Sequence, residues 1–217
     1  MHMERRGHRE LTDPAEWTSK RGGLFVVSGP SGVGKDTVLR ELLAAPNTIP
    51  NLSRVVTATT RPPRPGEVDG VDYHFLTRQE FLRLSRKGAF LETVEYADQL
   101  YGTPIEGIDR LRDGGVDAIL KIECRGAQAV RDRYPDVVLI FLAPPSRDEL
   151  IERLTSRPAE TDEQVEERLR IAEEELRAVR YYDYVVVNDF ISRAVDALRA
   201  IVLSHRMRVV PPERKEV

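Results

Sequence analysis

The chain has 217 residues, of which 41% are hydrophobic and 32% are charged, and its net charge is -3 from 33 basic and 36 acidic side chains. These values suit one core of moderate size with small inserted lobes, and they argue against a general nucleic-acid binder, which needs a strong positive excess. The single cysteine excludes an internal disulfide framework, and no apolar run approaches the roughly 20 residues of a membrane span. We therefore expect a cytoplasmic protein that binds neither nucleic acid nor membrane.

The N-terminal part of the chain divides into a tail, a strand, a glycine-rich loop and a helix. The first 21 residues are polar and lack a sustained period, which predicts a mobile tail or a short helix docked through Trp17. LFVVSG, residues 24–29, is a short apolar run typical of a buried strand. It leads through the glycine-rich loop into a predicted helix over 35–45, which stops near Pro46.

The next part of the chain is expected to be irregular and rich in β structure. Residues 54–60 are β-branched and predict one strand, and prolines and glycines then forbid regular structure until about Tyr73. A helix is predicted between a Thr77 cap and Gly88, followed by a strand over 90–96.

From Pro104 onward, strands and helices alternate regularly. Two helix starts have the spacing of a capping box, Ser146 with Glu149 and Thr161 with Gln164. Such alternation predicts an α/β fold with a parallel sheet covered by helices on both faces. The predicted helices span 105–115, 125–134, 146–157, 161–182 and 191–206, and the predicted strands span 117–123, 137–145 and 184–189.

The stretch GPSGVGKDT nearly completes a phosphate-binding loop. Gly29, Gly34 and Lys35 satisfy G-x-x-x-x-G-K-[ST], but Asp36 stands where a hydroxyl is expected. Amides of residues 32–37 would point at nucleotide phosphates, helped by the positive end of the helix, and Lys35 would reach the terminal phosphates. A glycine-rich turn without a ligand is the alternative. The position between the first apolar strand and a helix favours phosphate binding.

The residue after Lys35 is a candidate ligand for a metal ion. Mg²⁺ prefers oxygen ligands and often takes carboxylates, so Asp36 would bind Mg²⁺ directly or through a water molecule. Alternatively, Asp36 is only a favourable residue for the first turn of a helix, and Thr37 supplies the hydroxyl.

A second anion site is indicated in TATTRPPRPGEVDGVDYHF. This rigid, irregular loop carries Arg61 and Arg64, and guanidinium groups match the geometry of phosphate oxygens. A solvated basic turn is the alternative.

With these segments the chain resembles the guanylate kinases, which phosphorylate GMP with ATP. The resemblance covers about residues 23–206. TTRPPRPGEVDGVDYHF and LYGTP are specific to this family, whereas the glycine loop alone indicates only a superfamily. The other matching segments, in family order, are GPSGVGK, FLETVEY, RGAQAV, IFLAPPS, ERLTSR, EERLRIA and VVVND.

The resemblance implies a P-loop NTPase core with an inserted β-rich GMP-binding lobe and a helical lid. It also implies that the protein acts on ATP and GMP with Mg²⁺, as a monomer or a homodimer. The implied divisions are tails at 1–21 and 207–217, a core at 22–53 and 104–206, a lid at about 147–172 and a GMP lobe at 54–103.

The resemblance also implies roles for individual residues. Phosphoryl transfer mainly needs alignment and neutralisation of charge, and Lys35 with Arg153, Arg157 and Arg168 of the lid would supply that. Surface ion pairs with Glu152, Glu166 and Glu167 are the alternative for the lid arginines. The ATP site would comprise Gly29, Pro30, Ser31, Gly32, Val33, Gly34, Lys35, Asp36 and Thr37, with Asn188 near the adenine. The GMP phosphate would contact Arg61, Arg64, Tyr73 and Tyr101, and guanine would be read by Glu92 and Thr103 with Thr57 nearby.

Four residues depart from the usual family pattern. Asp36 replaces a common Ser, Lys121 and Glu123 replace Asp, and Arg125 replaces Gln. Glu123 remains placed to act on guanine or on a hydrated metal, at the carboxyl end of a predicted strand. Lys121 would pair with Asp36 or Glu123, or point elsewhere.

Two other functions compete with GMP phosphorylation. A related P-loop kinase for another phosphorylated substrate is disfavoured by Glu92 and the YGTP segment. A non-catalytic protein-binding module is disfavoured by the intact Gly29, Gly34 and Lys35.

Overall fold

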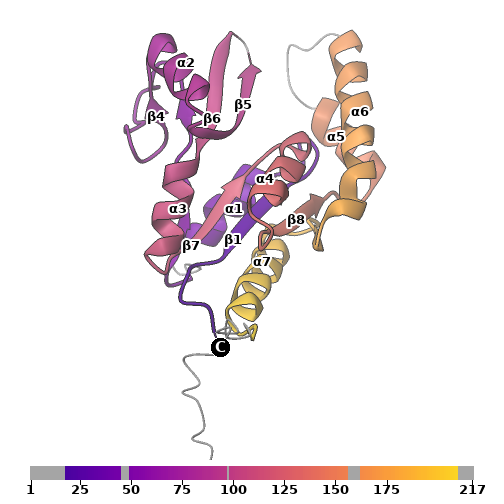
Figure 1. Ribbon diagram of the computed structural model, residues 1–217. Coiled ribbons are helices and arrows are strands. Elements are labelled where there is room, and N and C mark those ends of the chain that lie inside the picture. The colour runs from indigo at the N-terminus through magenta and orange to yellow at the C-terminus, as the bar shows by residue number, and fades with distance from the viewer. Residues whose placement is uncertain (1–17, 45–48, 97, 156–161, 210–217) are drawn as a thin grey trace, which may run out of the picture.

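The computed structural model describes residues 18–44, 49–96, 98–155 and 162–209. A core of strands and helices carries two groups of elements on one side (Figure 1). One is a small sheet with helix α2, and the other is the helix pair α5 and α6. Among the described residues, the helices include none with both the length and the apolar character needed to cross a bilayer.

The core contains a five-stranded parallel sheet with the strand order β2-β7-β1-β8-β9. The central strand β1 pairs with β7 on one side and with β8 on the other, and all five of its residues are buried. A strand buried on both faces reads as a continuous apolar run, which is why LFVVS predicted this position. The strands span Leu52–Arg54 (β2), Asp117–Lys121 (β7), Leu24–Ser28 (β1), Val138–Ala143 (β8) and Tyr184–Val187 (β9).

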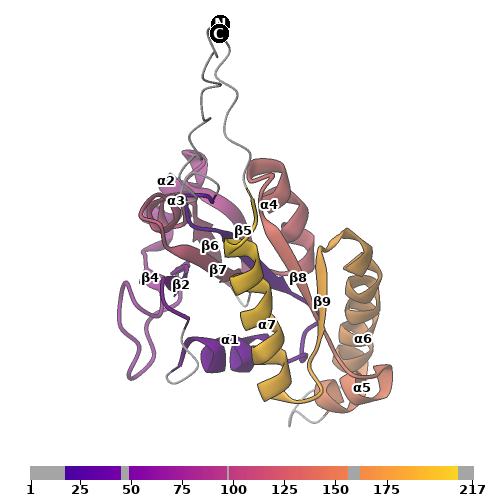
Figure 2. The same cartoon turned by 90° about the horizontal axis from the view of Figure 1, so that it is seen from below.

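Helices cover both faces of this sheet, as the alternating pattern predicts. On one face, α1 (Lys35–Leu43) and α7 (Ile191–Arg206) lie side by side and share an apolar core with β1, β8 and β9 (Figure 2). On the other face, α3 (Ile105–Asp113) and α4 (Ala127–Arg133) pack on β1, β7 and β8. The α/β fold class is confirmed.

The small sheet has four strands in the order β4-β3-β6-β5, antiparallel except for the β3–β4 pair. Its own core is small, and Phe81 of α2 stacks on Phe90 with 4.5 Å between ring centroids. The predicted Thr77 cap is present, and together with Glu80 it forms a capping box. These elements span Ala58–Thr59 (β3), His74–Phe75 (β4), Arg78–Arg86 (α2), Phe90–Tyr96 (β5) and Gln99–Pro104 (β6).

Helices α5 (Arg147–Thr155) and α6 (Asp162–Arg177) pack on each other through leucines and Ala172. Ser146 Oγ accepts from the backbone of Glu149 at 3.1 Å, while the Glu149 carboxylate pairs with Arg153. Thus only half of the predicted capping box forms there, and the box predicted at Thr161 lies outside the described residues.

The prediction of a single strand over 54–60 is wrong. The chain forms β2 at the edge of the core sheet and then β3 in the small sheet. The amide of Val55 still donates to Ile119 of the core at 3.0 Å, and Thr60 donates to Leu100 of the small sheet at 3.0 Å. The predicted strand 117–123 likewise ends at Lys121, because residues 124–126 form a 3₁₀ turn, η2 (Cys124–Gly126).

Most of the predicted tails lies outside the described residues. The N-terminal prediction included Arg21, which is in fact tied to the core through ion pairs with Asp109 at 2.9 Å and Asp113 at 2.8 Å.

Candidate functional site

The glycine-rich loop leaves the carboxyl end of β1 and opens α1. Gly29 and Gly34 have φ values of +147° and +95°. A Cβ atom on Gly29 would lie 2.2 Å from the carbonyl oxygen of Leu142, and one on Gly34 would lie 2.7 Å from Asn188 Nδ2. A side chain at Gly29 would therefore collide with the backbone, and one at Gly34 would be strained and would displace the Asn188 amide. Asn188 Nδ2 also donates to the Val33 carbonyl at 2.8 Å, so the Asn188 side chain supports the loop.

Lys35 is buried within this loop, with 8% of its surface exposed. Its ammonium donates to the carbonyls of Gly29 at 2.5 Å and Pro30 at 3.0 Å. These contacts hold the positive charge beneath the loop, next to the positive end of α1. The loop thus combines a buried positive charge with the amino end of a helix, which favours the binding of an anion.

Asp36 and Lys121 form an ion pair beside the loop. The Lys121 ammonium donates to both carboxylate oxygens of Asp36, at 2.7 and 3.0 Å. Burial opposes ionisation of Asp36, but the hydrogen bonds and charge of Lys121, with the charges of Arg54 and Lys35, outweigh it and lower the pKa of Asp36. Of the three alternatives for Lys121, the structure has the pair with Asp36.

This ion pair bears on whether the site suits a directly bound metal ion. The described part of the chain contains no group of three or more His, Cys, Asp or Glu side chains that could hold a metal. Asp36 is the carboxylate of the loop, and both of its oxygens are taken by an ammonium. A directly bound metal ion would therefore have to share the Asp36 carboxylate with Lys121 or displace Lys121 from it. Thr37, in the first turn of α1, is half-buried.

The second candidate anion site lies in the loop before β4. Arg61 Nη2 donates to both oxygens of Glu67 at 2.7 and 2.9 Å, and its guanidinium lies 5.5 Å from the centroid of the Tyr73 ring. The pKa of Arg61 is raised chiefly by the Glu67 hydrogen bonds. Tyr73 and Tyr101 are close, with 6.2 Å between ring centroids. Three of the four predicted residues thus come together, while Arg64 is exposed.

Glu67 was missed by the sequence analysis. Its carboxylate also accepts from the backbone amide of Arg64 at 2.7 Å, so it holds both ends of the RPPR segment. An acidic residue six positions after Arg61 in a proline-rich turn was the available signal.

The predicted guanine readers are adjacent on β5 and β6. Thr103 Oγ1 is buried and donates to Glu92 Oε1 at 3.0 Å. Burial raises the pKa of Glu92, the Thr103 hydrogen bond lowers it, and the charge of Glu123 raises it again. Glu123 is exposed at the start of η2, and Thr57 is half-buried where the chain passes from the core to the small sheet.

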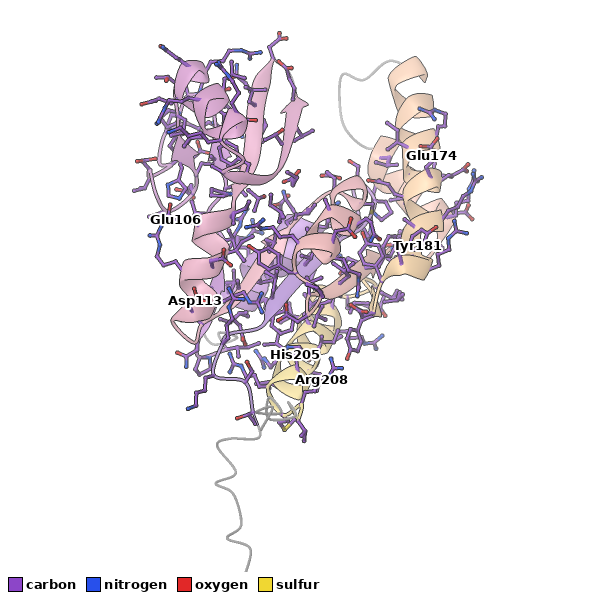
Figure 3. The ribbon with its side chains drawn as sticks, in the orientation of Figure 1. Glu106, Asp113, Glu174, Tyr181, His205 and Arg208 are labelled. Atoms are coloured by element: carbon purple, nitrogen blue, oxygen red, sulfur yellow. The ribbon has the colours of Figure 1, made fainter. Side chains whose placement is uncertain are left out.

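The predicted lid arginines are only partly described. Arg153 on α5 pairs with Glu149 and also donates to the carbonyl of Asn188 at 3.2 Å. This contact links α5 to the segment that supports the loop. Arg157 lies outside the described residues, as do the side chains of Arg168 and Arg125. Glu106 of the core helix α3 and Glu174 of α6 lie at opposite flanks of the molecule in the view of Figure 3.

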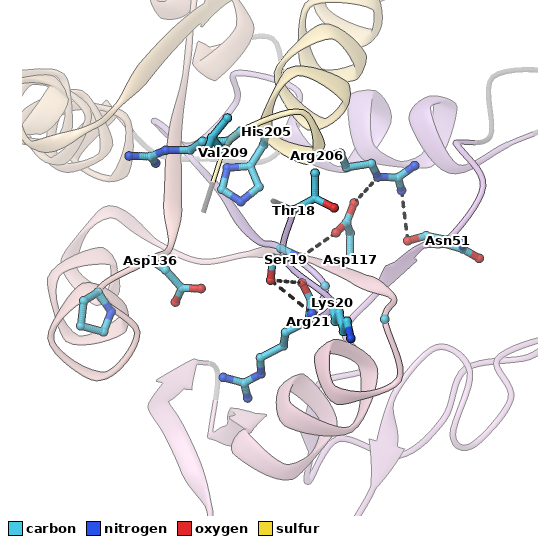
Figure 4. Close-up of a pocket in the computed structure, with 15 residues that line it drawn as sticks. Thr18, Ser19, Lys20, Arg21, Asn51, Asp117, Asp136, His205, Arg206 and Val209 are labelled. Atoms are coloured by element: carbon cyan, nitrogen blue, oxygen red, sulfur yellow. Dashed lines mark hydrogen bonds and ion pairs between the residues drawn. The ribbon is translucent and has the colours of Figure 1, made fainter. Parts of the chain in front are cut away.

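A cavity of about 690 Å³ lies at the other end of the core sheet (Figure 4). Within it, Asp117 accepts from the Gly23 amide at 2.6 Å and from Arg206 at 2.7 Å. In parallel α/β sheets, ligands bind beyond the carboxyl ends of the strands. This cavity is at the amino ends of the strands, so the glycine-rich loop at their carboxyl ends remains the candidate phosphate site.

A parallel sheet whose central strand runs through this glycine loop into a helix defines the P-loop class of nucleotide-binding proteins. A family model described as guanylate kinase matches residues 21–205. Curated guanylate kinases of Streptococcus agalactiae serotype III and Streptococcus pyogenes serotype M3 are both 46% identical over 191 residues, 88% of this chain and 90% of theirs. The crystal structure of guanylate kinase from Anaplasma phagocytophilum is 32% identical, with a TM-score of 0.67 over 89% of this chain and 93% of that one. The chain belongs to the guanylate kinase family, whose function is phosphoryl transfer from ATP to GMP.

Proposed function

We propose that this protein transfers the terminal phosphoryl group of ATP to GMP, and also to dGMP, giving ADP and GDP or dGDP. The proposal rests on the presence of two candidate sites in one chain that belongs to the guanylate kinase family. A phosphate loop with a buried lysine follows β1, and a pair formed by the buried Thr103 and the half-buried Glu92 lies on the small sheet.

The ATP phosphates are assigned to the loop. Backbone amides from Gly32 to Thr37 bind them, and Lys35 moves from the loop carbonyls to the phosphoryl oxygens. Asn188 supports the loop through Val33 and lies close enough to Gly34 to border the adenine site. The remaining loop residues in this assignment are Gly29, Pro30 and Ser31.

The GMP phosphate is assigned to Arg61, Arg64, Tyr73 and Tyr101. Arg61 is already held by Glu67 and by the Pro62 carbonyl, so its guanidinium would lose little side-chain freedom on binding a phosphate. Since the GMP phosphate is an ionised nucleophile, no residue is needed to remove a proton from it.

The guanine base is assigned to Glu92 and Thr103. Guanine presents adjacent N1–H and N2 amine donors, which an ionised carboxylate can accept, and the Thr103 hydroxyl can donate to O6. Thr57 and Glu123 complete this site in the proposal. Adenine would place an acceptor against the carboxylate, and an unpaired buried polar group discriminates by roughly 10⁴–10⁵.

The lobes and the lid are assigned in the same way. The core at 22–53 and 104–206 binds ATP, the lobe at 54–103 binds GMP, and a lid at about 147–172 brings Arg153, Arg157 and Arg168 to the phosphates. Arriving arginines neutralise developing charge, and closure keeps water from the phosphoryl group. Guanylate kinases use ATP with Mg²⁺ as a general feature of kinases. Here we assign Asp36 to the waters of that ion rather than to the ion itself, with Thr37 as the neighbouring hydroxyl.

A coupled assay of ADP release across nucleoside monophosphates tests the proposal. We expect GMP to be used efficiently and AMP at least about 10⁴-fold less well in kcat/KM. A preference for a different phosphorylated substrate would favour a related kinase. If ADP release with every nucleotide tested stayed at the level of the Lys35→Ala variant, a protein-binding module would be favoured.

A further inference from the structure

The Asp36–Lys121 pair joins two parts of the chain that are 85 residues apart. Lys121 is the last residue of β7, and its register partner is Val27 of β1, just before the loop. Asp36 lies in the first turn of α1, just after the loop. The ion pair therefore spans the loop entrance and its exit.

The negative charge of Asp36 is unfavourable for binding a polyphosphate at this position. It lies next in sequence to Lys35, and a bound polyphosphate would carry several negative charges beside it. Like charges a few ångströms apart repel, and the repulsion is weakened where water reaches the groups. The side chain of Asp36 is 69% exposed and that of Lys121 is 28% exposed, so the lysine is the more firmly placed partner.

We propose that Lys121 is a positioning residue that holds the Asp36 carboxylate against the end of β7, neutralising it beside the bound polyphosphate and keeping it out of direct contact with the metal ion. This inference rests on the proposed ATP site. The two residues act as one unit, because the charge of Lys121 is needed at this place only while Asp36 is charged.

Two alternative roles for Lys121 and Asp36 predict different effects of substitution on nucleotide binding. If Lys121 gripped a phosphate itself, its loss would weaken nucleotide binding whatever residue stood at 36. If Asp36 were a direct ligand of Mg²⁺, its loss would weaken the binding of ADP with Mg²⁺ and leave the binding of metal-free ADP unchanged.

A double-mutant cycle measured by ADP binding separates these roles. Isothermal titration calorimetry of the full chain is carried out with ADP plus Mg²⁺ and with ADP plus EDTA. The proteins are the wild type, Asp36→Asn, Lys121→Met and the double variant. Lys87→Met is the matched control, since Lys87 is exposed at the end of α2.

We expect Lys121→Met to weaken metal-free ADP binding by about tenfold and ADP–Mg²⁺ binding by less, because the cation offsets the exposed carboxylate. Adding Asp36→Asn should restore both affinities to within about threefold of the wild type. Asp36→Asn alone should strengthen metal-free ADP binding, and this arm stands even if Lys121→Met fails to fold. Lys87→Met should bind as the wild type does.

Three results would overturn the inference. These are an unchanged metal-free affinity in Lys121→Met, a loss that Asp36→Asn does not rescue, or a loss in Asp36→Asn confined to ADP with Mg²⁺. The proposed function is tested separately, by wild-type phosphorylation of GMP. A wild-type protein that did not bind ADP would overturn both.

Discussion

Thr103 and Glu92 form a hydrogen-bonded pair across β6 and β5, with 3.0 Å between Thr103 Oγ1 and Glu92 Oε1. Thr103 is fully buried, and burial raises the pKa of Glu92. A half-buried carboxylate with one oxygen engaged by a hydroxyl has its remaining acceptor sites available for a ligand with two adjacent donors. This relationship underlies the first two predictions.

Glu92→Gln should raise the KM for GMP by about 10- to 100-fold, because an amide accepts fewer hydrogen bonds and presents donors of its own. The KM for ATP should change little. Steady-state kinetics with each substrate varied in turn would measure both values. The control is Glu95→Gln on the same strand, whose carboxylate is exposed and pairs with Arg78 at 3.0 Å. GMP kinetics that Glu92→Gln leaves untouched would remove Glu92 as the reader and make Glu123 the next candidate.

The pH dependence of kcat/KM for GMP should show the raised pKa of Glu92. The carboxylate reads guanine only when ionised, so binding is lost as the pH falls through a pKa above the ordinary value of about 4.3. The phosphate of GMP also titrates in the acidic range, but it does so equally for every variant. The difference between the wild-type and Glu92→Gln profiles therefore isolates Glu92. Parallel profiles would contradict the assignment.

The parts of the fold that rest on local pattern were predictable from the sequence. The apolar run of β1 and the glycine motif placed the loop at the carboxyl end of a buried strand, and the loop is there. The break between β2 and β3 was not predictable, because a β-branched run does not indicate which of two sheets each residue joins. The family resemblance predicted an inserted lobe beginning near this break, but it did not predict where the strand is interrupted.

The pairings within the site were only partly predictable. Glu92 and Thr103 are 11 residues apart and meet because β5 and β6 form a hairpin. The partner of Lys121 remained one of three alternatives, since a ladder between β1 and β7 decides which side chains meet at the loop. The Glu67 contact to Arg61 depends on the path of a proline-rich loop, which propensity does not specify.

Lys35→Ala should lower kcat by on the order of 10²-fold or more, because a preorganised cationic contact to the transferring phosphoryl group is lost. Thermal unfolding should confirm that the variant is folded, and Lys87→Ala serves as the control for loss of a lysine. Turnover like that of the wild type in Lys35→Ala would remove Lys35 from the mechanism.

Arg61→Lys should raise the KM for GMP by about tenfold or more, although the charge is kept. Lysine is a point charge that lacks the planar fork matching phosphate oxygens, and it cannot reproduce the contact of the guanidinium with the Tyr73 ring. Kinetics with GMP varied at saturating ATP would measure the change. Arg78→Lys, at an exposed ion pair on the same lobe, is the matched control. Equal effects of the two substitutions would show that Arg61 does not bind GMP.

Gly34→Ala should lower both the free energy of unfolding and the affinity for ADP. Alanine would be held at a φ of +95°, which costs about 1–3 kcal/mol, and its Cβ would lie 2.7 Å from Asn188 Nδ2. The amide of Asn188 would have to move, and its hydrogen bond to the Val33 carbonyl would be lost from the loop.

Gly88→Ala separates the strain of the positive φ from the displacement of Asn188, since Gly88 also has a positive φ, of +68°, but has nothing within 4 Å of the added Cβ. We therefore expect denaturant unfolding to show a larger loss for Gly34→Ala than for Gly88→Ala, and calorimetry to show weakened ADP binding only for Gly34→Ala. Equal losses of stability, with ADP binding unchanged in both variants, would mean that Asn188 does not support the loop.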